Sequence, residues 1–462
     1  MNINELWRLD ATAQAHLVQT GEVQATELVA AALERIEAHN PELNAVVGLD
    51  PERAMERAAA VTEGPFAGVP FLAKDLLPYP RFRAAMGCRL FAGNVPDAHV
   101  PYTHRLEASG LVCLGKTTTS ELGLLGSTET HLEGVTRNPW GRELSASGSS
   151  GGAVTAVAAG LVPIAHASDG GGSIRQPAAL GGLFGFKPSA GATAPAVLID
   201  NPFVRLTSEH GVTRSVRDSA ALLAATAAGE GAEPVQPAAL RPLRIGLYTT
   251  TALGAAAPPE GREAVEAAAR LCEQLGHHVE EIAAPPVDGA AYSNAFFAAA
   301  ASAVMGLEQM LSPMLGRPLA PGDVEPFTWA LLDWGKRMSD DARAQALAEV
   351  HAQGEIMRGF LAGVDVALCP TVGAERPTLG FLAPHLPMDV ITRRMERLAG
   401  FTALHNAAGA PAMSVPLSWT EDGLPVGCLF AASPGQDARL LQLAYQLEEA
   451  APWADRWPPR FT

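Results

Sequence analysis

The sequence is poor in charged and in aromatic side chains. Charged residues make up 18% of the 462 residues and aromatic residues 6%, whereas 48% are hydrophobic and 45 are glycine. Apolar content this high excludes a disordered chain and favours a compact body with closely packed helices and many turns. The length allows one large domain or two to three ordinary ones.

Cysteine is also scarce. The five cysteines are scattered, odd in number and without the CxxC spacing of zinc sites and redox motifs, and they are Cys88, Cys113, Cys272, Cys369 and Cys428. Neither a disulfide framework nor a metal site follows from such a pattern. We therefore expect free, buried thiols.

Basic residues are too few to suggest a nucleic-acid partner. The net charge is −16 and the pI about 5.2, and such a surface repels phosphate backbones and anionic lipid.

The N-terminus lacks the basic start and apolar run of a signal peptide. The longest apolar stretches, around Ala295–Leu307 and Ala153–Ala167, are too short to span a bilayer. We expect a soluble, cytoplasmic protein with no membrane partner.

Short apolar runs and segments of helical periodicity alternate along the chain. Strands are predicted at 44–49, 69–74, 111–114, 163–167, 243–249, 364–368, 412–417 and 426–431. Helices are predicted at 4–39 (two), 51–61, 100–109, 153–160, 213–230, 262–275, 285–360 (interrupted), 387–406 and 437–447. This alternation predicts an α/β fold around one sheet, and the absence of a linker favours a single domain over residues 1–462.

The most unusual segment is a glycine loop, Asp169-Gly170-Gly171-Gly172-Ser173-Ile174-Arg175. Consecutive glycines let successive backbone N–H groups turn towards one point, where they stabilise an oxyanion. A serine at the end of the row lies beside that point, so the nucleophile and the oxyanion hole come from one loop. Asp169 and Arg175 bracket the loop and are placed to pair across it. The alternative is a flexible loop without a role.

A second segment, Gly148-Ser149-Ser150-Gly151-Gly152, runs into a predicted helix. Its alternative reading is ordinary helix capping. It also satisfies G-x-S-x-G, which would make Ser150 the nucleophile of an α/β-hydrolase. That turn requires an apolar strand before it, and residues 141–146 are polar.

Lys74 lies in an apolar run that we read as a buried strand ending near it. Most lysines are solvated, but burial among apolar neighbours disfavours the ammonium form. A lysine in such a position acts as a neutral base near pH 7.

Together these segments resemble the amidase signature family. The family's serine-glycine run, its Asp-x-Gly-Gly-Ser-Ile-Arg loop and its Gly-x-Lys-Pro element match residues 148–189, and GVPFLAKD matches the element with the family's lysine. Further blocks match at GKTTTSELG, RNPW, GAPAMSVPL and GLPVGCLF. The resemblance runs nearly end to end and is weakest over about 190–360. The N-terminal third is most similar to the family's 6-aminohexanoate cyclic dimer hydrolases, urethanases and aryl acylamidases.

The resemblance implies a role for each of these residues. Ser173 matches the acylated serine, Ser149 the serine that follows a cis peptide bond, and Lys74 the base; the serines are 24 positions apart, as in the family. The N–H groups of Gly170, Gly171, Gly172 and Ser173 match the oxyanion hole. Gly170 departs from the family's usual Thr or Ile, which puts the tightness of the hole in doubt, and Ser147 replaces a usual glycine. The implied fold is a central mixed sheet with helices on both faces, and no metal or cofactor is implied.

The implied activity is hydrolysis of C–N bonds other than peptide bonds. We expect core motifs at 64–190 and 360–450, and pocket segments at about 190–210, 285–360 and 380–405. Their apolar character, including Phe296, Phe297, Met305, Trp329 and Trp334, favours aryl or aliphatic apolar amides, with carbamates as a further class. Three alternatives stay open: a cyclic or linear 6-aminohexanoate oligomer hydrolase, an amidotransferase subunit, and a pseudoenzyme. A homodimer is compatible with the resemblance, and His166 and His405 are read as core histidines.

Overall fold

The computed structural model describes residues 3–196 and 203–461, and one mixed sheet runs through it. In spatial order its strands are β1 (Val46–Val47), β3 (Val112–Thr117), β2 (Pro70–Lys74), β8 (Ile164–Asp169), β10 (Ser208–Thr213), β9 (Phe184–Lys187), β14 (Ala412–Trp419), β15 (Pro425–Ala431), β13 (Val366–Pro370), β11 (Arg244–Leu247) and β12 (His278–Glu281). Strand β2 is parallel to β3 and β8, and β11 is parallel to β12 and β13. The other pairs in the sheet are antiparallel.

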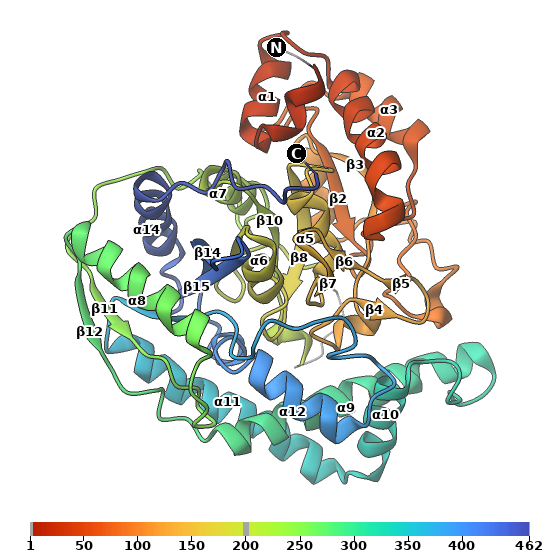
Figure 1. Cartoon of the computed structure of the whole chain (residues 1–462). Helices are drawn as coiled ribbons and strands as arrows, with labels where there is room; N and C mark the ends of the chain where they lie inside the picture. Colours follow the sequence, from red (N-terminus) through yellow and green to blue (C-terminus); the bar gives the residue numbers. More distant parts are fainter. Residues whose placement is uncertain (1–2, 197–202, 462) are drawn as a thin grey trace.

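Helices cover both faces of this sheet (Figure 1). They are α1 (Ala11–Gln19), α2 (Ala25–Leu43), α3 (Pro51–Ala60), α4 (Pro101–Ala108), α5 (Gly151–Ala158), α6 (Arg175–Gly181), α7 (Val216–Ala225), α8 (Pro259–Gln274), α9 (Gly289–Leu315), α10 (Pro326–Arg337), α11 (Asp340–Ala362), α12 (Met388–Leu398), α13 (Ala403–Ala407) and α14 (Asp437–Ala450). Two short hairpins, β4 (Glu129–Thr130) with β5 (Gly134–Val135) and β6 (Arg137–Asn138) with β7 (Gly141–Ser145), stand beside the sheet.

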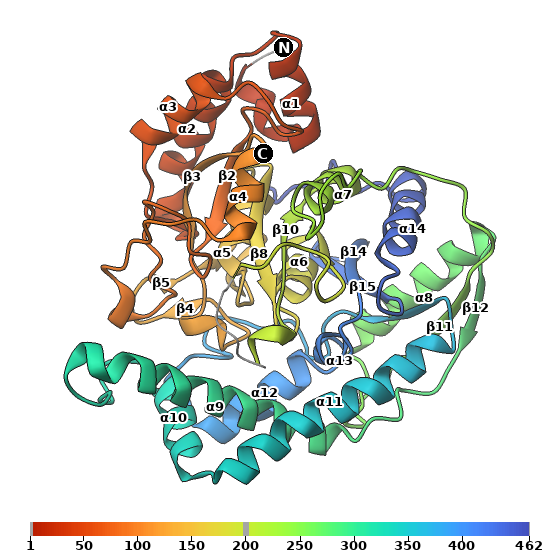
Figure 2. The ribbon, with the colours of Figure 1, turned by 180° about the vertical axis from the view of Figure 1, so that it is seen from behind.

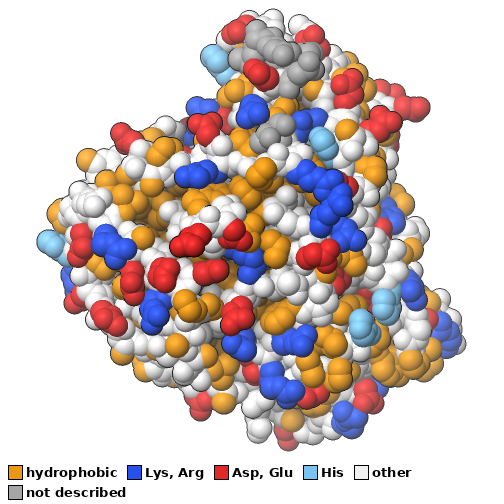
Figure 3. All heavy atoms as spheres, in the orientation of Figure 1, with side chains coloured by type: hydrophobic (Ala, Val, Ile, Leu, Met, Phe, Trp, Pro, Cys, Tyr) orange, Lys and Arg blue, Asp and Glu red, His pale blue; other side chains and the backbone are white. Residues whose placement is uncertain are grey.

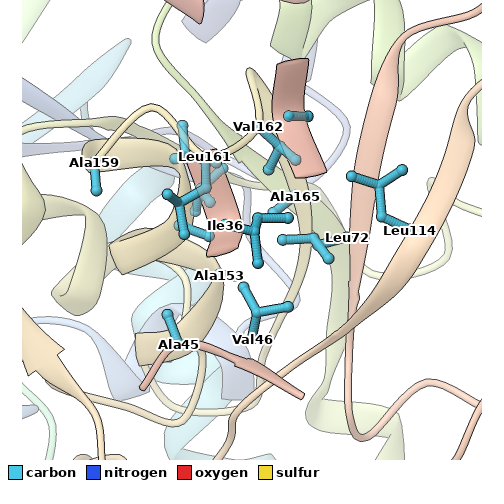
Figure 4. Packing of buried hydrophobic residues seen from close by; sticks show 14 of the residues in the cluster. Ile36, Ala45, Val46, Leu72, Leu114, Ala153, Ala159, Leu161, Val162 and Ala165 are labelled. Carbon is cyan, nitrogen blue, oxygen red and sulfur yellow. The ribbon is translucent and has the colours of Figure 1, made fainter. Parts of the chain in front are cut away.

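Side chains of the buried strands alternate between the two faces, as the pleat requires. Leu72 packs with α2, α3 and α5, whereas Phe71 and Ala73 pack with α1, α4 and α7. Figure 4 shows Leu72 meeting Ile36 and Ala165 in the first of these clusters. Because both faces are covered by helices, these strands read in the sequence as continuous apolar runs.

Helices α9, α10, α11 and α12 form a group, here called the cap, on the side of the molecule opposite α1–α3 (Figures 1 and 2). Helix α9 packs along both α10 and α11. At 27 residues, α9 is long and apolar enough to cross a membrane, although the apolar stretch 295–307 within it is too short for that on its own. Half of its most apolar segment is buried in the structure. Within the cap it serves as a core helix.

Most predicted elements are present with their boundaries shifted by a few residues, including β2, α5, β8 and α14. Among the described residues, helix α6, the sheet strands β9, β10 and β12, and the four short hairpin strands β4 to β7 were not predicted. The polar stretch before Ser149 is a strand, β7, which pairs with β6 and bridges to Thr378 but lies outside the main sheet.

The five cysteines are free and buried, as predicted. On the face seen in Figure 3, acidic and basic side chains are interspersed with apolar patches. On this face the acidic side chains are therefore not gathered into one patch.

Candidate active site

Lys74 is the last residue of β2, and its side chain is fully buried. Its Nζ lies 2.8 Å from Ser149 Oγ, 2.8 Å from Ser150 Oγ and 3.0 Å from Ser168 Oγ. Burial lowers the pKa of Lys74 to about 7, against the opposing effect of Glu209 and Asp169. A large fraction of this amine is therefore neutral near pH 7 and able to accept a proton from a hydroxyl.

Ser149 and Ser150 form the turn before α5, and the peptide bond between Gly148 and Ser149 is cis. Gly148 packs so closely on Ser127 that a Cβ there would lie 2.5 Å from the carbonyl oxygen of Ser127. Ser149 lines a cavity, whereas Ser150 is fully buried and its Oγ donates to the Ser168 carbonyl. This geometry disfavours Ser150 as a nucleophile, because its hydroxyl faces the interior.

The glycine loop follows β8 directly and leads into α6. Gly172 has a φ of +134°, and a Cβ there would lie 2.2 Å from Gln176 Nε2, so only glycine fits. Its N–H donates to Asp169 Oδ1 at 2.7 Å. The prediction that Gly172 supplies an oxyanion donor is revised accordingly, because this N–H is already engaged in shaping the loop.

The N–H groups of Gly170, Gly171 and Ser173 find no protein partner within the described parts of the chain. Gly170, Gly171 and Ser173 all line the cavity that Ser149 also lines. A Cβ on Gly170 would lie 3.2 Å from Thr207 Oγ1. Where the family usually has the larger Thr or Ile, this chain thus has a glycine with Thr207 close beside it.

Asp169 and Arg175 form the buried pair that the loop's sequence predicts. Arg175 Nη2 donates to Asp169 Oδ1 at 2.8 Å and Arg175 Nε donates to Oδ2 at 2.9 Å, with both side chains fully buried. Burial alone would raise the pKa of Asp169, but the guanidinium holds it well below its usual range. The carboxylate therefore stays ionised and accepts the N–H groups of Gly172 and Ile174.

Helix α13 and the turn before it also hold the ion pair of Asp169 and Arg175 in place. Arg175 donates to the Thr402 carbonyl at 2.9 Å and to the Asn406 side chain at 2.7 Å. Thr402 Oγ1 donates to the Gly171 carbonyl at 2.8 Å and accepts from Gln176 Nε2 at 2.7 Å. The sequence did not point to Gln176, Thr402 or Asn406, because their partners lie more than 200 positions away or are backbone atoms.

The cavity that joins these groups has a volume of about 300 Å³ and mostly apolar walls. Its other walls come from residues 122–126, the turn at Ala252 and Leu253, helix α9, and the segment from Met395 to Leu404. Of the large apolar residues proposed for the pocket, Phe296 and Phe297 line it. Met305, Trp329 and Trp334 instead pack into the hydrophobic cluster behind it. Residues 197–202 of the predicted segment 190–210 lie outside the described residues.

Both histidines near the motifs are buried. His166 Nε2 lies 2.9 Å from a carboxylate oxygen of Glu209, and His405 Nδ1 lies 3.5 Å from Arg175. Burial, together with Arg175, lowers the pKa of His405 to about 3. Each ring keeps one nitrogen without a protein partner among the described residues, so neither is a fully satisfied core histidine.

Within residues 3–196 and 203–461, no group of three or more His, Cys, Asp or Glu side chains is arranged to hold a metal ion. The groups gathered at the serine end of the cavity are hydroxyls, an amine and backbone N–H donors, and the carboxylate of Glu396 lines another part of it. Such a set can carry out acyl transfer.

A family model described as Amidase matches residues 27–441. The chain belongs to the amidase signature family. It is 35% identical to the 6-aminohexanoate-cyclic-dimer hydrolase of Paenarthrobacter ureafaciens over 98% of this chain and 97% of that protein.

Two solved structures of this family resemble the whole fold. A 6-aminohexanoate cyclic dimer hydrolase complexed with substrate superposes with a TM-score of 0.90 at 32% identity, covering 99% of this chain and all of that one. A bacterial aryl acylamidase superposes with a TM-score of 0.85 at 27% identity, covering 97% of each chain. The protein is therefore an α/β amidase that hydrolyses C–N bonds other than peptide bonds, of the class found in linear amides.

Proposed function

We propose that the protein is a serine amidohydrolase for apolar amides, in which Ser173 is the nucleophile, Ser149 the proton relay and Lys74 the base. The observation that carries this proposal is the fully buried amine of Lys74, 2.8 Å from the hydroxyl of Ser149. That hydroxyl and Ser173 line the same cavity.

In the proposed reaction, neutral Lys74 takes a proton from Ser149 while Ser149 takes the proton of Ser173. The Ser173 oxygen attacks the acyl carbon, and the N–H groups of Gly170, Gly171 and Ser173 receive the oxyanion. Ser149 then protonates the leaving amine and is reprotonated by Lys74. This delivery matters most for an amide, because an amine is a poor leaving group. Water hydrolyses the acyl-enzyme by the same relay.

The apolar walls of the cavity support aryl and aliphatic amides as substrates. Leu76, Leu125, Phe296 and Val304 all face into it. A carbamate differs from an amide by one oxygen on the acyl side, so an apolar carbamate is included in the proposed range. A second candidate is the cyclic 6-aminohexanoate dimer, because relatives with that activity align over nearly the entire chain.

A substrate panel tests the proposal. It consists of one anilide, one aryl carbamate, one aliphatic amide and the cyclic 6-aminohexanoate dimer, assayed with the purified single chain. Hydrolysis of the anilide with covalent labelling of Ser173 by a fluorophosphonate, located by peptide mass spectrometry, supports it. Labelling at Ser150, or activity that survives Ser173→Ala, contradicts it. Hydrolysis of the cyclic dimer alone selects the second candidate.

A further inference from the structure

The cavity carries a single carboxylate on walls that are otherwise neutral. Among the described residues that line it, Glu396 is the one acidic side chain, and none is lysine, arginine or histidine. A charge in a mostly apolar cavity acts in a lower dielectric than at the surface, so its field on a bound molecule is strong.

Glu396 is held in place by a neighbouring helix. It lies on α12, and Ser293 Oγ of α9 donates to its Oε1 at 2.6 Å. The side chain is half-buried, and no protein partner of Oε2 occurs within the described residues. One carboxylate oxygen thus fixes the side chain, and the other is left to accept a hydrogen bond from a bound molecule.

The arginines next to Glu396 on α12 do not neutralise it. Arg393 pairs with Asp389 at 2.8 Å, Arg394 donates to the Phe381 carbonyl at 2.7 Å, and Arg397 is exposed. The negative charge in the cavity therefore has no protein counter-ion on its own helix.

The helix that holds the carboxylate also contacts the glycine loop, and both line the cavity. A Cβ on Gly171 would lie 3.4 Å from the Phe296 ring, so α9 touches the loop at Phe296. Ser293 is three residues earlier on the same helix, roughly 5 Å along its axis. Because Glu396 and the loop line the same cavity, a chain of several bonds from the scissile carbonyl is the kind of substrate group that would meet Glu396.

We propose that, among amides whose body is apolar, the site prefers those that also carry an ammonium group several bonds from the scissile carbonyl, which Glu396 binds, and that it rejects amides with a carboxylate at that place. This inference rests on the proposed amidohydrolase function. A substrate ammonium group next to Glu396 forms an ion pair with it, which replaces the water that both groups lose on binding. A substrate carboxylate at the same place is repelled by Glu396, and no Lys, Arg or His among the described lining residues offsets that repulsion.

The test compares para-nitroanilides of equal chain length: hexanoyl, ω-aminohexanoyl and the adipoyl monoanilide. A second series places the ammonium on the amine side, as the hexanoyl amide of 4-(aminomethyl)benzylamine beside that of 4-methylbenzylamine, with products separated by chromatography. We expect kcat/KM to be about 10- to 100-fold higher for the ammonium member than for the neutral member of at least one series. The adipoyl monoanilide is expected to be the poorest substrate.

Glu396→Gln keeps the shape of the side chain and its bond from Ser293 while removing the charge. The ammonium-to-neutral ratio should then fall towards one. A matched control, Glu281→Gln on the exposed strand β12, should keep the wild-type ratio. In Glu396→Lys, the adipoyl monoanilide should become the preferred anilide.

Two results overturn this inference while leaving the proposed function standing: a ratio near one in both series for the wild-type enzyme, or a ratio that Glu396→Gln does not change. Failure to hydrolyse any member would contradict the proposed function instead. In that case, calorimetric titration of the Ser173→Ala variant with the same amides still decides whether Glu396 binds the ammonium group.

Discussion

The two sides of the cavity are built differently. On the sheet side, Lys74, Ser149 and the glycine loop are fixed by hydrogen bonds with set partners. On the cap side, α9 and α12 present mainly apolar side chains, which pack mostly without directional bonds apart from the hydrogen bond from Ser293 to Glu396. Hydrogen-bonded groups tolerate little displacement, whereas apolar packing tolerates substitution of similar volume. The sheet side is suited to fixed chemistry and the cap side to a substrate range that can vary.

The sharpest way to test this division is to remove the groups on the sheet side. Ser173→Ala and Lys74→Met should each lower kcat by ~10⁴-fold on any substrate, since the proposed residues act as one unit. Circular dichroism and thermal unfolding should show that both variants are folded. Hydrolysis by Lys74→Met at the wild-type rate would contradict the role of the amine.

The pH dependence tests the same amine without a mutation. Burial lowers the pKa of Lys74 to about 7, and only the neutral form accepts a proton. Below pH 7, kcat/KM should therefore fall about tenfold per pH unit and level off above pH 8. Pre-steady-state measurement of acylation excludes a change in product release. An acidic limb centred near pH 4 would assign the base to a carboxylate.

Breaking the ion pair under the glycine loop should cost stability as well as activity. Asp169→Asn leaves the Arg175 guanidinium buried without its counter-charge, and we expect a loss of about 3 to 5 kcal/mol in the free energy of unfolding. The matched control in the cap is Asp389→Asn, which breaks the exposed pair with Arg393 and should cost less than ~1 kcal/mol. Denaturant titration of both variants measures the difference. Equal losses would refute the contrast between the two sides.

A substitution on the cap side should affect binding more than chemistry. Phe296 lines the cavity beside Gly171, so Phe296→Ala removes apolar contact and should raise KM for an anilide about tenfold. Trp329 packs behind the cavity, and Trp329→Ala should lower the melting temperature without changing KM. A fall in kcat for Phe296→Ala as large as that of the serine variant would mean that the cap takes part in the chemistry.

The sequence predicted the sheet side better than the cap side. Lys74, the serine pair and the glycine loop are short contiguous patterns, and their apolar or glycine context signals burial or close approach. Thr402 and Asn406 carry no such local signal, because the tertiary fold alone brings them to Gly171 and Asp169. Large apolar residues of the cap share one helical pattern, and the sequence does not separate Phe296, which lines the cavity, from Met305, which packs behind it.

The missed elements have local causes. Strand β10 reads Ser208-Glu-His-Gly-Val-Thr213, in which polar side chains hide the strand, although nearly all of it is buried between β8 and β9. Helix α6 has only seven residues and includes a proline and a terminal glycine. Strand β12 is largely exposed at the edge of the sheet and carries two consecutive glutamates. In each case tertiary pairing outweighs local propensity.

The smallest expected effect concerns the contact between the two sides. Glu121, beside the cavity loop 122–126, accepts hydrogen bonds at 2.8 Å from the Glu325 N–H and at 2.5 Å from the Thr328 hydroxyl, at the start of α10. Burial, together with Glu121, raises the pKa of Glu325 to about 8, and burial raises that of Glu121. The folded state therefore holds a proton on Glu325 that the unfolded chain releases near pH 4.5.

This proton's contribution to stability is present below pH 4.5 and is lost as the pH rises through about 8. Glu325→Gln keeps the acceptor for the His131 N–H and removes the titration. The melting temperature of the wild type should fall by roughly 2 to 4 °C relative to this variant between pH 5 and pH 8.5. A parallel course of the two melting curves over that range would show that the acidic pair does not couple the cap to the sheet. The contact between the cap and the sheet would then depend on apolar packing and on hydrogen bonds that do not titrate between pH 5 and pH 8.5.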